Sequence, residues 1–375
     1  MKKVLIIANH IDWVYSLRKE LIEKLSEIYR VIICIPECKD NNKLDYFKSI
    51  NVDFAFVNFQ GRDKNPFKDI GVFIKYLNTI KSLNPNVIIT YTIKPNIYGS
   101  IAGKLLRKKV VINVTGLGTG FHSNKVVKLI AKNLYSIGCK ASYHVFFQNT
   151  NNMSLFINNK MVERSKCSLI PGSGVNIEKF KPMEKTKEDD IIRFLFIGRI
   201  MKEKGIEEYL QVAESLIKKY SNIEFQILGS FEEDRYKDII YDNKNERIKY
   251  LGRSDDVRNE IREVDCIVNP SYHEGMSNVL LEGAAMGKPL IASNIPGCKE
   301  IIEEGYNGYL FELKSVESME EKLIQFIELD EESKEIMGKN SRRKVEKEFD
   351  RNIVINEYMK VIKDILKEGR QYESI

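Results

Sequence analysis

Two short segments of this sequence combine charged side chains with glycine, directly after stretches that are typical of β-strands. The first is Gly198-Arg199, followed after four residues by Lys204-Gly205. Glycine permits a tight turn, and two cations on a flexible loop can converge on one anion such as a diphosphate. Arginines and lysines in loops usually only contact water. This segment alone therefore does not indicate a binding site for an anion.

The second segment runs from Asn269 to Pro289 and carries two carboxylates, Glu274 in a loop and Glu282 in a helix that begins near Ser277. Backbone N–H groups at a helix start form an anion site; here they belong to Gly275, Met276, Ser277, Asn278 and Val279. A carboxylate there can simply stabilise the helix dipole. Two carboxylates beside such a turn are better suited to hydroxyl groups, and a nucleotide sugar offers both hydroxyls and phosphates.

The elements that must position these segments alternate between strand-like and helix-like patterns. In the first half we predict strands at 4–8, 31–35, 53–57, 87–90, 110–114 and 145–148, and helices at 15–28, 66–83, 96–106 and 124–140. In the second half we predict strands at 191–197, 224–228, 248–250, 266–269 and 289–292, and helices at 206–219, 257–262, 278–286 and 351–368. This order is typical of parallel, doubly wound sheets, whose ligands bind beyond the carboxyl ends of the strands.

The length of 375 residues suits two such domains. Glycines and prolines gather between Pro171 and Pro182, where we place the join. We therefore expect an α/β protein with two Rossmann-like, doubly wound domains that face each other across a cleft. Their expected bounds are 1–182 and 183–350, and a C-terminal helical segment, 351–375, is expected to pack back toward the N-terminal domain.

Charge is unevenly divided along the chain. Residues 1–180 contain 27 Lys and Arg against 12 Asp and Glu, whereas the whole chain contains 59 and 53. No acidic residue occurs between Asp69 and Glu163, although this stretch holds twelve Lys and Arg. The imbalance implies an anionic partner: membrane lipid, nucleic acid or a phosphorylated substrate. No helix-turn-helix, zinc-finger or RNA-recognition signature supports nucleic acid.

Within the acid-free stretch, the segment 124–140 mixes aliphatic residues with Lys125, Lys128, Lys132 and Lys140. It is either an amphipathic helix on an anionic bilayer or an ordinary helix with a solvated basic face. The surrounding charge favours the bilayer. No apolar run approaches the ~20 residues of a membrane span, and the six cysteines include no Cys-x-x-Cys. We expect no metal site and a location on the inner face of the cytoplasmic membrane.

The motifs of the second half, taken in order, resemble glycosyltransferase family 4, which has the GT-B fold. The resemblance rests on Gly198-Arg199-x4-Lys204-Gly205, Glu274-x7-Glu282, Gly287-x-Pro289 and Gly297-x-x-Glu300. It implies a retaining sugar transfer from a nucleotide sugar, without a metal or other cofactor. It also implies catalytic roles for three residues: Arg199 and Lys204 bind the diphosphate, and Glu274 faces the positive charge that develops on the sugar.

The same resemblance implies the remaining contacts to the donor. Glu282 binds the ribose hydroxyls, Arg253 contacts the base, and the amides of Gly275 through Val279 hold the sugar and phosphate. Gly198 shapes the turn that carries the two cations. The base is expected to be uracil and the sugar GalNAc or GlcNAc, with galactose and glucose left open.

The first half resembles a narrower group, bacterial enzymes that extend polyprenyl-diphosphate-linked oligosaccharides in capsule, O-antigen or glycoprotein assembly. The matching runs are Tyr91-Thr-x-Lys-Pro-Asn-x-Tyr-Gly99 and Asn113-Val-Thr-Gly-Leu-Gly-Thr-Gly-Phe121. The candidates for contact with the acceptor are Arg18, Thr115, Gly116 and His122. Many family members carry a histidine where this chain has Thr115-Gly116-Leu117-Gly118, and His122 either replaces it or is an ordinary surface residue. Arg18 either pairs with a lipid diphosphate or lies on an exposed helix face.

Other functions remain to be weighed against transfer to a lipid-linked acceptor. One is transfer to a soluble acceptor by the same fold. Another is a sugar-nucleotide epimerase, which shares the two-domain architecture but needs other acid and base groups. A glycosidase that uses Glu274 and Glu282 as acid and base leaves the cationic loop unexplained.

Overall fold

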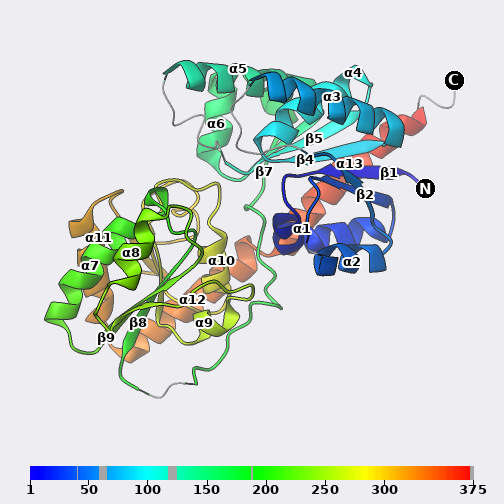
Figure 1. Ribbon diagram of the computed structural model, residues 1–375. Helices are drawn as coiled ribbons and strands as arrows, with labels where there is room; N and C mark the ends of the chain where they lie inside the picture. Colours follow the sequence, from blue (N-terminus) through cyan, green and yellow to red (C-terminus); the bar gives the residue numbers. More distant parts are fainter. Residues whose placement is uncertain (40, 59–65, 117–124, 187–188, 372–375) are drawn as a thin grey trace. The chain divides into compact units, whose positions relative to one another are not determined.

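A computed structural model describes residues 1–39, 41–58, 66–116, 125–186 and 189–371. The chain divides into two compact units (Figure 1). The N-terminal unit contains residues 1–173 and 352–375, and the C-terminal unit contains residues 174–351. The second unit begins inside the Pro171–Pro182 segment, and the last helix of the chain belongs to the first unit.

The N-terminal unit is built on a parallel sheet, whose described strands follow the order β3-β2-β1-β4-β5-β6-β7. Its strands are β1 Lys3–Ile7, β2 Arg30–Ile35, β3 Asp53–Phe56, β4 Val87–Tyr91, β5 Lys109–Val114, β6 His144–Phe147 and β7 Cys167–Leu169. Its helices are α1 Ile11–Ser26, α2 Asn41–Ser49, α3 Pro66–Leu83, α4 Ser100–Leu105, α5 Lys125–Ala141, α6 Thr150–Asn158 and α13 Arg351–Gln371. The strand order reverses between β1 and β4, which is where doubly wound sheets bind ligands.

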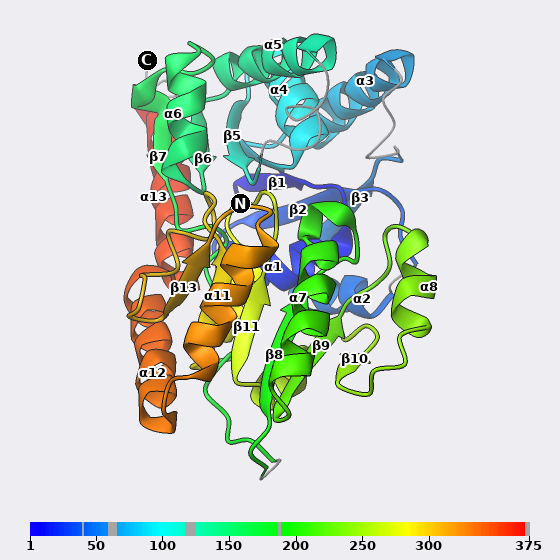
Figure 2. The same ribbon diagram turned by 90° about the vertical axis from the view of Figure 1, so that its left-hand side faces the viewer.

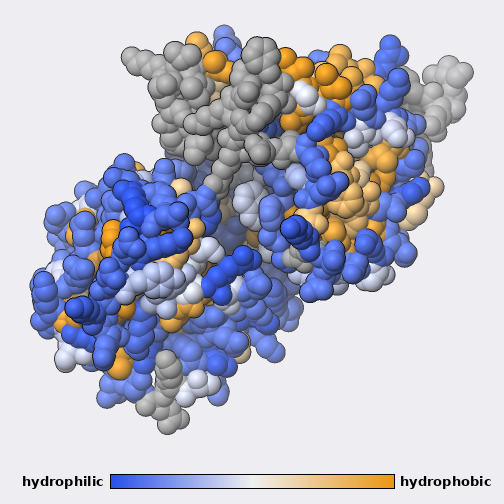
Figure 3. Space-filling model, in the orientation of Figure 1, coloured by the Kyte–Doolittle hydropathy of each residue, from blue (hydrophilic) through white to orange (hydrophobic). Residues whose placement is uncertain are grey.

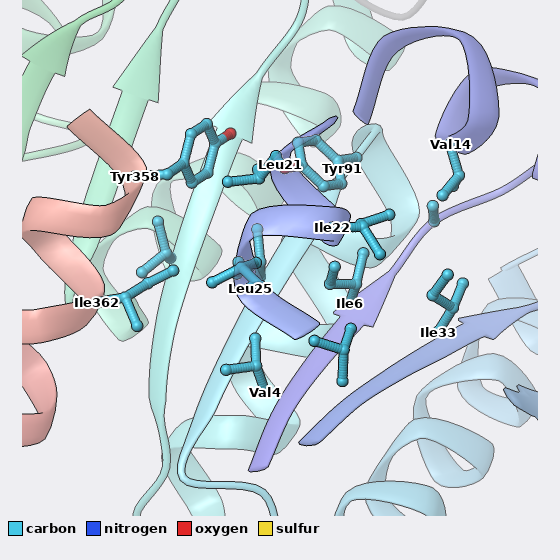
Figure 4. Close-up of a cluster of buried hydrophobic side chains, with 14 of the residues drawn as sticks. Val4, Ile6, Val14, Leu21, Ile22, Leu25, Ile33, Tyr91, Tyr358 and Ile362 are labelled. Atoms are coloured by element: carbon cyan, nitrogen blue, oxygen red, sulfur yellow. The ribbon is translucent and has the colours of Figure 1, made fainter. Parts of the chain in front are cut away.

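Strand side chains alternate between two cores because successive residues point to opposite faces of a sheet. Val4 and Ile6 join a core covered by α1, α2 and α13, whereas Leu5 and Ile7 join one covered by α3 and α4. Figures 1 and 2 show these two helix layers on opposite sides of the sheet. In Figure 4, Tyr358 of α13 lies in the same cluster as side chains of α1 and β1.

The C-terminal unit repeats the plan with the order β10-β9-β8-β11-β12-β13, again parallel in every described pair. Its strands are β8 Ile192–Ile197, β9 Ile223–Leu228, β10 Ile248–Tyr250, β11 Cys266–Asn269, β12 Leu290–Ser293 and β13 Gly308–Phe311. Its helices are α7 Ile206–Lys219, α8 Arg235–Tyr241, α9 Arg258–Arg262, α10 Asn278–Ala285, α11 Val316–Ile327 and α12 Glu331–Glu348. Strands β8 and β11 are neighbours, so the loops that follow them start at adjacent points of one edge.

The predicted α/β class and the two doubly wound domains are confirmed. The predicted helix at 96–106 is wrong in its first turn, because Pro95–Gly99 forms a π-helical turn and the α-helix begins at Ser100. Helix α1 begins four residues before its predicted start, because His10 caps it through a bond from the Asp12 N–H. None of the described helices combines the length and apolar character of a membrane span.

Candidate active site

Lys204 is positioned by a tight backbone turn after β8. Residues Lys202–Lys204 form a single 3₁₀ turn, and Gly205 follows with a φ of 74°, in the left-handed region that favours glycine. A Cβ at Gly205 would lie 2.2 Å from the carbonyl oxygen of Pro270. Only glycine allows this approach, which holds the cationic loop against the loop after β11.

Glu274 lies in that second loop and meets Lys204. The Lys204 Nζ and Glu274 Oε1 atoms are 2.5 Å apart, and both side chains are mostly buried. Seventy positions separate the two residues in the chain, and the adjacency of β8 and β11 brings them together. The two segments singled out in the sequence therefore form one charged cluster at the carboxyl edge of the sheet.

The start of α10 is fixed beneath Glu274 by buried hydrogen bonds. Asn269, the last residue of β11, donates from Nδ2 to the Ser277 hydroxyl over 2.6 Å, and it accepts from the Ser271 hydroxyl over 2.7 Å. The Ser277 hydroxyl in turn accepts from the Leu280 N–H and caps the helix. Amides in the first turn of a helix have no acceptor inside the helix, so Asn278 and Val279 present N–H groups suited to an anion.

Gly297 closes the other side of the Glu274 loop. Its φ is 90°, and a Cβ there would lie 2.9 Å from both the Glu274 Cβ and the Gly275 carbonyl oxygen. The Gly297 carbonyl accepts from the Ser277 N–H over 2.9 Å, and its N–H donates to the Glu300 carboxylate over 2.6 Å. The close backbone contacts at Gly205 and Gly297 thus hold the loops that carry Lys204 and Glu274 in place.

The other two predicted cations have different partners. Arg199 forms an ion pair with Glu232, with Nη1 and Oε2 3.4 Å apart. Arg253 is exposed and pairs with Asp255 over 3.0 Å. Neither contact involves Glu274. Gly198, which precedes Arg199, packs its backbone against Gly229, where any Cβ would collide with the Gly198 carbonyl oxygen.

Glu282 lies in the second turn of α10, and its side chain is partly buried. Burial raises the pKa of Glu282 from 4.5 to about 7, while the positive charges of Arg351 and Lys179 lower it. A carboxyl group in this setting can accept a hydrogen bond from a hydroxyl and exchange a proton near neutral pH. The Glu282 carboxyl group is therefore better suited to a hydroxyl group of a ligand than to a phosphate group.

The corresponding edge of the N-terminal sheet is built from neutral buried side chains. The Asn113 Nδ2 donates to the Tyr358 hydroxyl over 2.5 Å, and its Oδ1 accepts from Gln148 over 3.4 Å. Asn96, in the π-helical turn, accepts from the Thr90 hydroxyl and donates to the Asn113 carbonyl, each over 2.8 Å. The network ties β4, β5, β6 and α13 together at one place.

Arg18 is a cation at this edge that is only 5% exposed. Its guanidinium lies over the Tyr91 ring, 4.5 Å from the ring centroid, and its Nη1 donates to the Leu17 carbonyl over 3.3 Å. Among the described residues no carboxylate forms an ion pair with it. Directly after Tyr91, Thr92 adopts a φ of 72°, a strained conformation that is common at functional sites.

Thr115 and Gly116 follow β5 at the same edge and are half-buried. A Cβ at Gly116 would meet no described atom within 4 Å, so packing alone does not demand glycine there. His122, the remaining candidate for acceptor contact, lies outside the described residues.

Sequence reasoning named Asn269 as a strand end and Ser277 as a helix start, but it missed the side-chain bonds that hold the charged cluster in place. Asn269, Ser271 and Ser277 form the buried network, and Glu232 is the partner of Arg199. The one sequence signal for Asn269 is its place, a polar residue at the end of an apolar strand. Nothing in the local pattern indicates which side chain it bonds.

Two family models match the chain, one for each unit. The model described as "Glycosyl transferase 4-like" matches residues 3–149, and the model described as "Glycosyl transferases group 1" matches residues 176–344. The second match contains Gly198, Lys204, Glu274 and Glu282.

Known proteins resemble the chain over nearly its whole length. An N,N'-diacetylbacillosaminyl-diphospho-undecaprenol alpha-1,3-N-acetylgalactosaminyltransferase of Campylobacter jejuni is 26% identical, over 94% of this chain and 96% of that protein. A UDP-Gal:alpha-D-GlcNAc-diphosphoundecaprenol alpha-1,3-galactosyltransferase of Escherichia coli is 29% identical, over 84% of each. A crystal structure of a glycosyltransferase from Rickettsia africae ESF-5 shares the fold, with a TM-score of 0.77 and 21% identity over 98% of this chain and 99% of that one. Since both units match glycosyltransferase models, the chain belongs to glycosyltransferase family 4 and is a glycosyltransferase with the GT-B fold.

Proposed function

We propose that the protein transfers GalNAc or GlcNAc from a UDP-sugar to a polyprenyl-diphosphate-linked saccharide, with retention of the anomeric configuration. The observation that carries the proposal is the ion pair of Lys204 and Glu274 beside the start of α10. A cation, a carboxylate and helix-terminal amides in one place suit a donor with a diphosphate and sugar hydroxyls. The two transferases compared above are named for diphospho-undecaprenol acceptors, and one is named for a UDP-sugar.

In the proposed reaction, the bond between the anomeric carbon and the diphosphate oxygen breaks, and its electron pair leaves with UDP. Lys204, Arg199 and the first-turn amides of α10 stabilise the negative charge that grows on the leaving group. Because these groups supply positive charge, the proposed reaction uses no metal. An acceptor hydroxyl forms the new bond to the same carbon on the face that the diphosphate leaves, and its proton passes to an oxygen of the departing diphosphate.

The Lys204–Glu274 pair has a second consequence for donor binding. A bare carboxylate at this point would repel an incoming diphosphate, and the ammonium group 2.5 Å away offsets that charge. Glu274 then remains available to face the positive charge that develops on the sugar ring. One pair of side chains thus suits both ends of the breaking bond.

On the acceptor side, we assign Arg18 to the lipid diphosphate. It is a buried guanidinium without a carboxylate partner among the described residues, and arginine binds phosphate oxygens in a bidentate manner. A lipid-linked acceptor requires work at a membrane surface. The acid-free stretch between Asp69 and Glu163 suits the anionic inner face of the cytoplasmic membrane.

The test is a panel of UDP-sugars, assayed for UDP release with and without a polyprenyl-diphosphate-linked monosaccharide. We expect release with one donor only, dependent on the lipid-linked acceptor and unaffected by EDTA. NMR of the product should show the donor's anomeric configuration. Equal release with a soluble sugar would argue against the lipid-linked acceptor, and formation of a new UDP-sugar without transfer would favour an epimerase.

A further inference from the structure

Three large aliphatic side chains of helix α5 point away from the core. Leu129, Ile130 and Ile137 are 57%, 54% and 52% exposed. The side of the helix that packs inward carries Tyr135 and Cys139 instead, which are buried. Helix α5 therefore has one face in the core, and Leu129, Ile130 and Ile137 lie outside that face.

Neighbouring helices extend this exposed apolar surface. Helices α3, α4 and α5 lie side by side, and Leu105 of α4, together with Ile70 and Ile74 of α3, is also about half exposed or more. In Figure 3, hydrophobic residues gather along the upper edge of the N-terminal unit, where Figure 1 places these helices. We call the six residues the α3–α5 apolar face: Ile70, Ile74, Leu105, Leu129, Ile130 and Ile137. Exposed large apolar side chains that gather on neighbouring helices mark an interaction site.

Every charged residue of α4 and α5 is basic, and α3 carries lysines and one acid, Asp69. Lys104, Arg107 and Lys140 are exposed on the same helices or the turns that end them. The nearest acid in the sequence, Asp69, is already engaged: it pairs with Lys94 over 2.8 Å and accepts from the Tyr98 hydroxyl over 2.9 Å.

These charges decide between the occupants of the face. A second copy of the chain would bring two basic surfaces together, which like-charge repulsion opposes. An anionic bilayer accepts aliphatic side chains beneath its headgroups and attracts the surrounding cations.

We propose that the α3–α5 apolar face inserts its side chains into an anionic bilayer, with the flanking lysines and arginines on the headgroups. This inference rests on the proposed function, because a lipid-linked acceptor needs the protein at the membrane. It goes further by naming the residues that enter the lipid, and it makes insertion, rather than charge alone, the source of binding.

The test compares the full-length protein with a triple variant, Leu129→Ser, Ile130→Ser and Ile137→Ser, on vesicles of phosphatidylcholine containing phosphatidylglycerol. The three side chains are exposed, so we expect unchanged circular dichroism and melting temperature. Cosedimentation should show vesicle affinity at least about tenfold lower. A control variant, Ile239→Ser with Ile336→Ser, removes side chains of similar exposure from the C-terminal unit and should bind as the wild type does.

A charge variant separates insertion from attraction. Replacing Lys125, Lys128 and Lys132 by Glu should also weaken binding, and the wild type should retain measurable binding at high salt, which screens charges but leaves apolar contacts. Loss of binding in the charge variant alone, with the serine variant unaffected, would refute insertion. So would a wild type that ignores vesicles but changes from dimer to monomer when the three serines are introduced.

Transfer assays keep this inference apart from the proposed function. With a short-chain, water-soluble diphosphate-linked acceptor, the serine variant should match the wild type. With the same sugar on a long polyprenyl chain in vesicles, its transfer rate should fall in parallel with its binding. A wild type that binds vesicles but transfers to neither acceptor would overturn the proposed function and leave the membrane face standing.

Discussion

The carboxyl edges of the two sheets differ in what they present, although both sheets are parallel and doubly wound. At the C-terminal edge, Lys204, Glu274 and the start of α10 lie together, and close backbone contacts at Gly205 and Gly297 hold their loops. The N-terminal edge holds buried amides and tyrosines together with the buried cation Arg18, which has no ion pair with a carboxylate among the described residues. The first arrangement suits a charged ligand held at close range, and the second suits a hydroxyl-rich ligand with one anionic group. Under the proposed function, the donor binds at the C-terminal edge and the acceptor at the N-terminal edge.

The largest expected effect is on catalysis at the C-terminal edge. Glu274→Gln and Lys204→Met should each lower kcat about 100- to 1000-fold, because each removes charge that acts on the breaking bond. Steady-state kinetics with the preferred donor gives the number. Lys322→Met, which breaks the surface pair with Glu304, is the control and should leave kcat unchanged. Near-normal turnover in the Lys204 variant would remove the distinction between the two edges.

The next effect concerns the close contact between Gly205 and Pro270. Gly205→Ala should lower the free energy of unfolding by about 2–4 kcal/mol, since the new Cβ meets the Pro270 carbonyl oxygen as well as straining the backbone. Gly252→Ala, which has a φ of 79° but open space around it, should cost about 1 kcal/mol from strain alone. Urea unfolding of both variants measures the difference. Equal costs would mean that the Pro270 contact is unimportant.

Glu282 provides a test by pH. Its folded pKa of about 7 lies above the unfolded value of 4.5, so the folded form holds the proton more tightly. The stability that this gives is complete below pH 4.5 and is lost as the pH rises through 7. Glutamine does not titrate, so the variant Glu282→Gln does not lose this stability as the pH rises. Its free energy of unfolding relative to that of the wild type should therefore rise by about 2–3 kcal/mol between pH 4.5 and 8. Urea unfolding of both proteins across this pH range should show the rise. A difference in stability that does not change with pH would contradict the raised pKa of Glu282.

At the N-terminal edge we expect an effect on one substrate only. Arg18→Met should raise KM for the lipid-linked acceptor about tenfold, which corresponds to about 1.4 kcal/mol, and leave donor KM unchanged. The exposed Arg30, paired with Asp53 at the amino end of β2, offers Arg30→Met as a matched control. An increase in the donor KM of the Arg18 variant would contradict the assignment of the N-terminal edge to the acceptor alone.

The smallest effect is expected for the amide network. Tyr358→Phe leaves the buried Nδ2 of Asn113 without its acceptor, which should cost about 1 kcal/mol of stability. Thermal unfolding measures this cost, and kcat should not change. A fall in kcat without any loss of stability would instead give the tyrosine hydroxyl a direct part in the reaction.

The sequence predicted most strands because a buried parallel strand is a continuous apolar run, as in β4, where every residue is buried. Helix α12 was not predicted, because it packs through small residues rather than an aliphatic stripe. At Gly338, for example, a Cβ would lie 2.2 Å from the Gly287 carbonyl oxygen. Such a contact depends on the turn after α10 and leaves no period in the local sequence of α12.

The site shows the same limit. Glu274, Lys204 and Glu282 could be named from loop position and family motifs, since both draw on local order. That Lys204 meets Glu274 while Arg199 meets Glu232 depends on the neighbours of each strand in the sheet. The role of Asn269 depends on three side chains that converge only after folding.

Helix α13 has a consequence for the order in which the protein is made. It supplies Val354, Tyr358 and Ile362 to the main core of the N-terminal unit, yet it is translated after the whole C-terminal unit. Domains generally fold in the order of synthesis. Here the half that leaves the ribosome first cannot complete this core until α13 has followed, so the C-terminal unit is the first that can complete its fold.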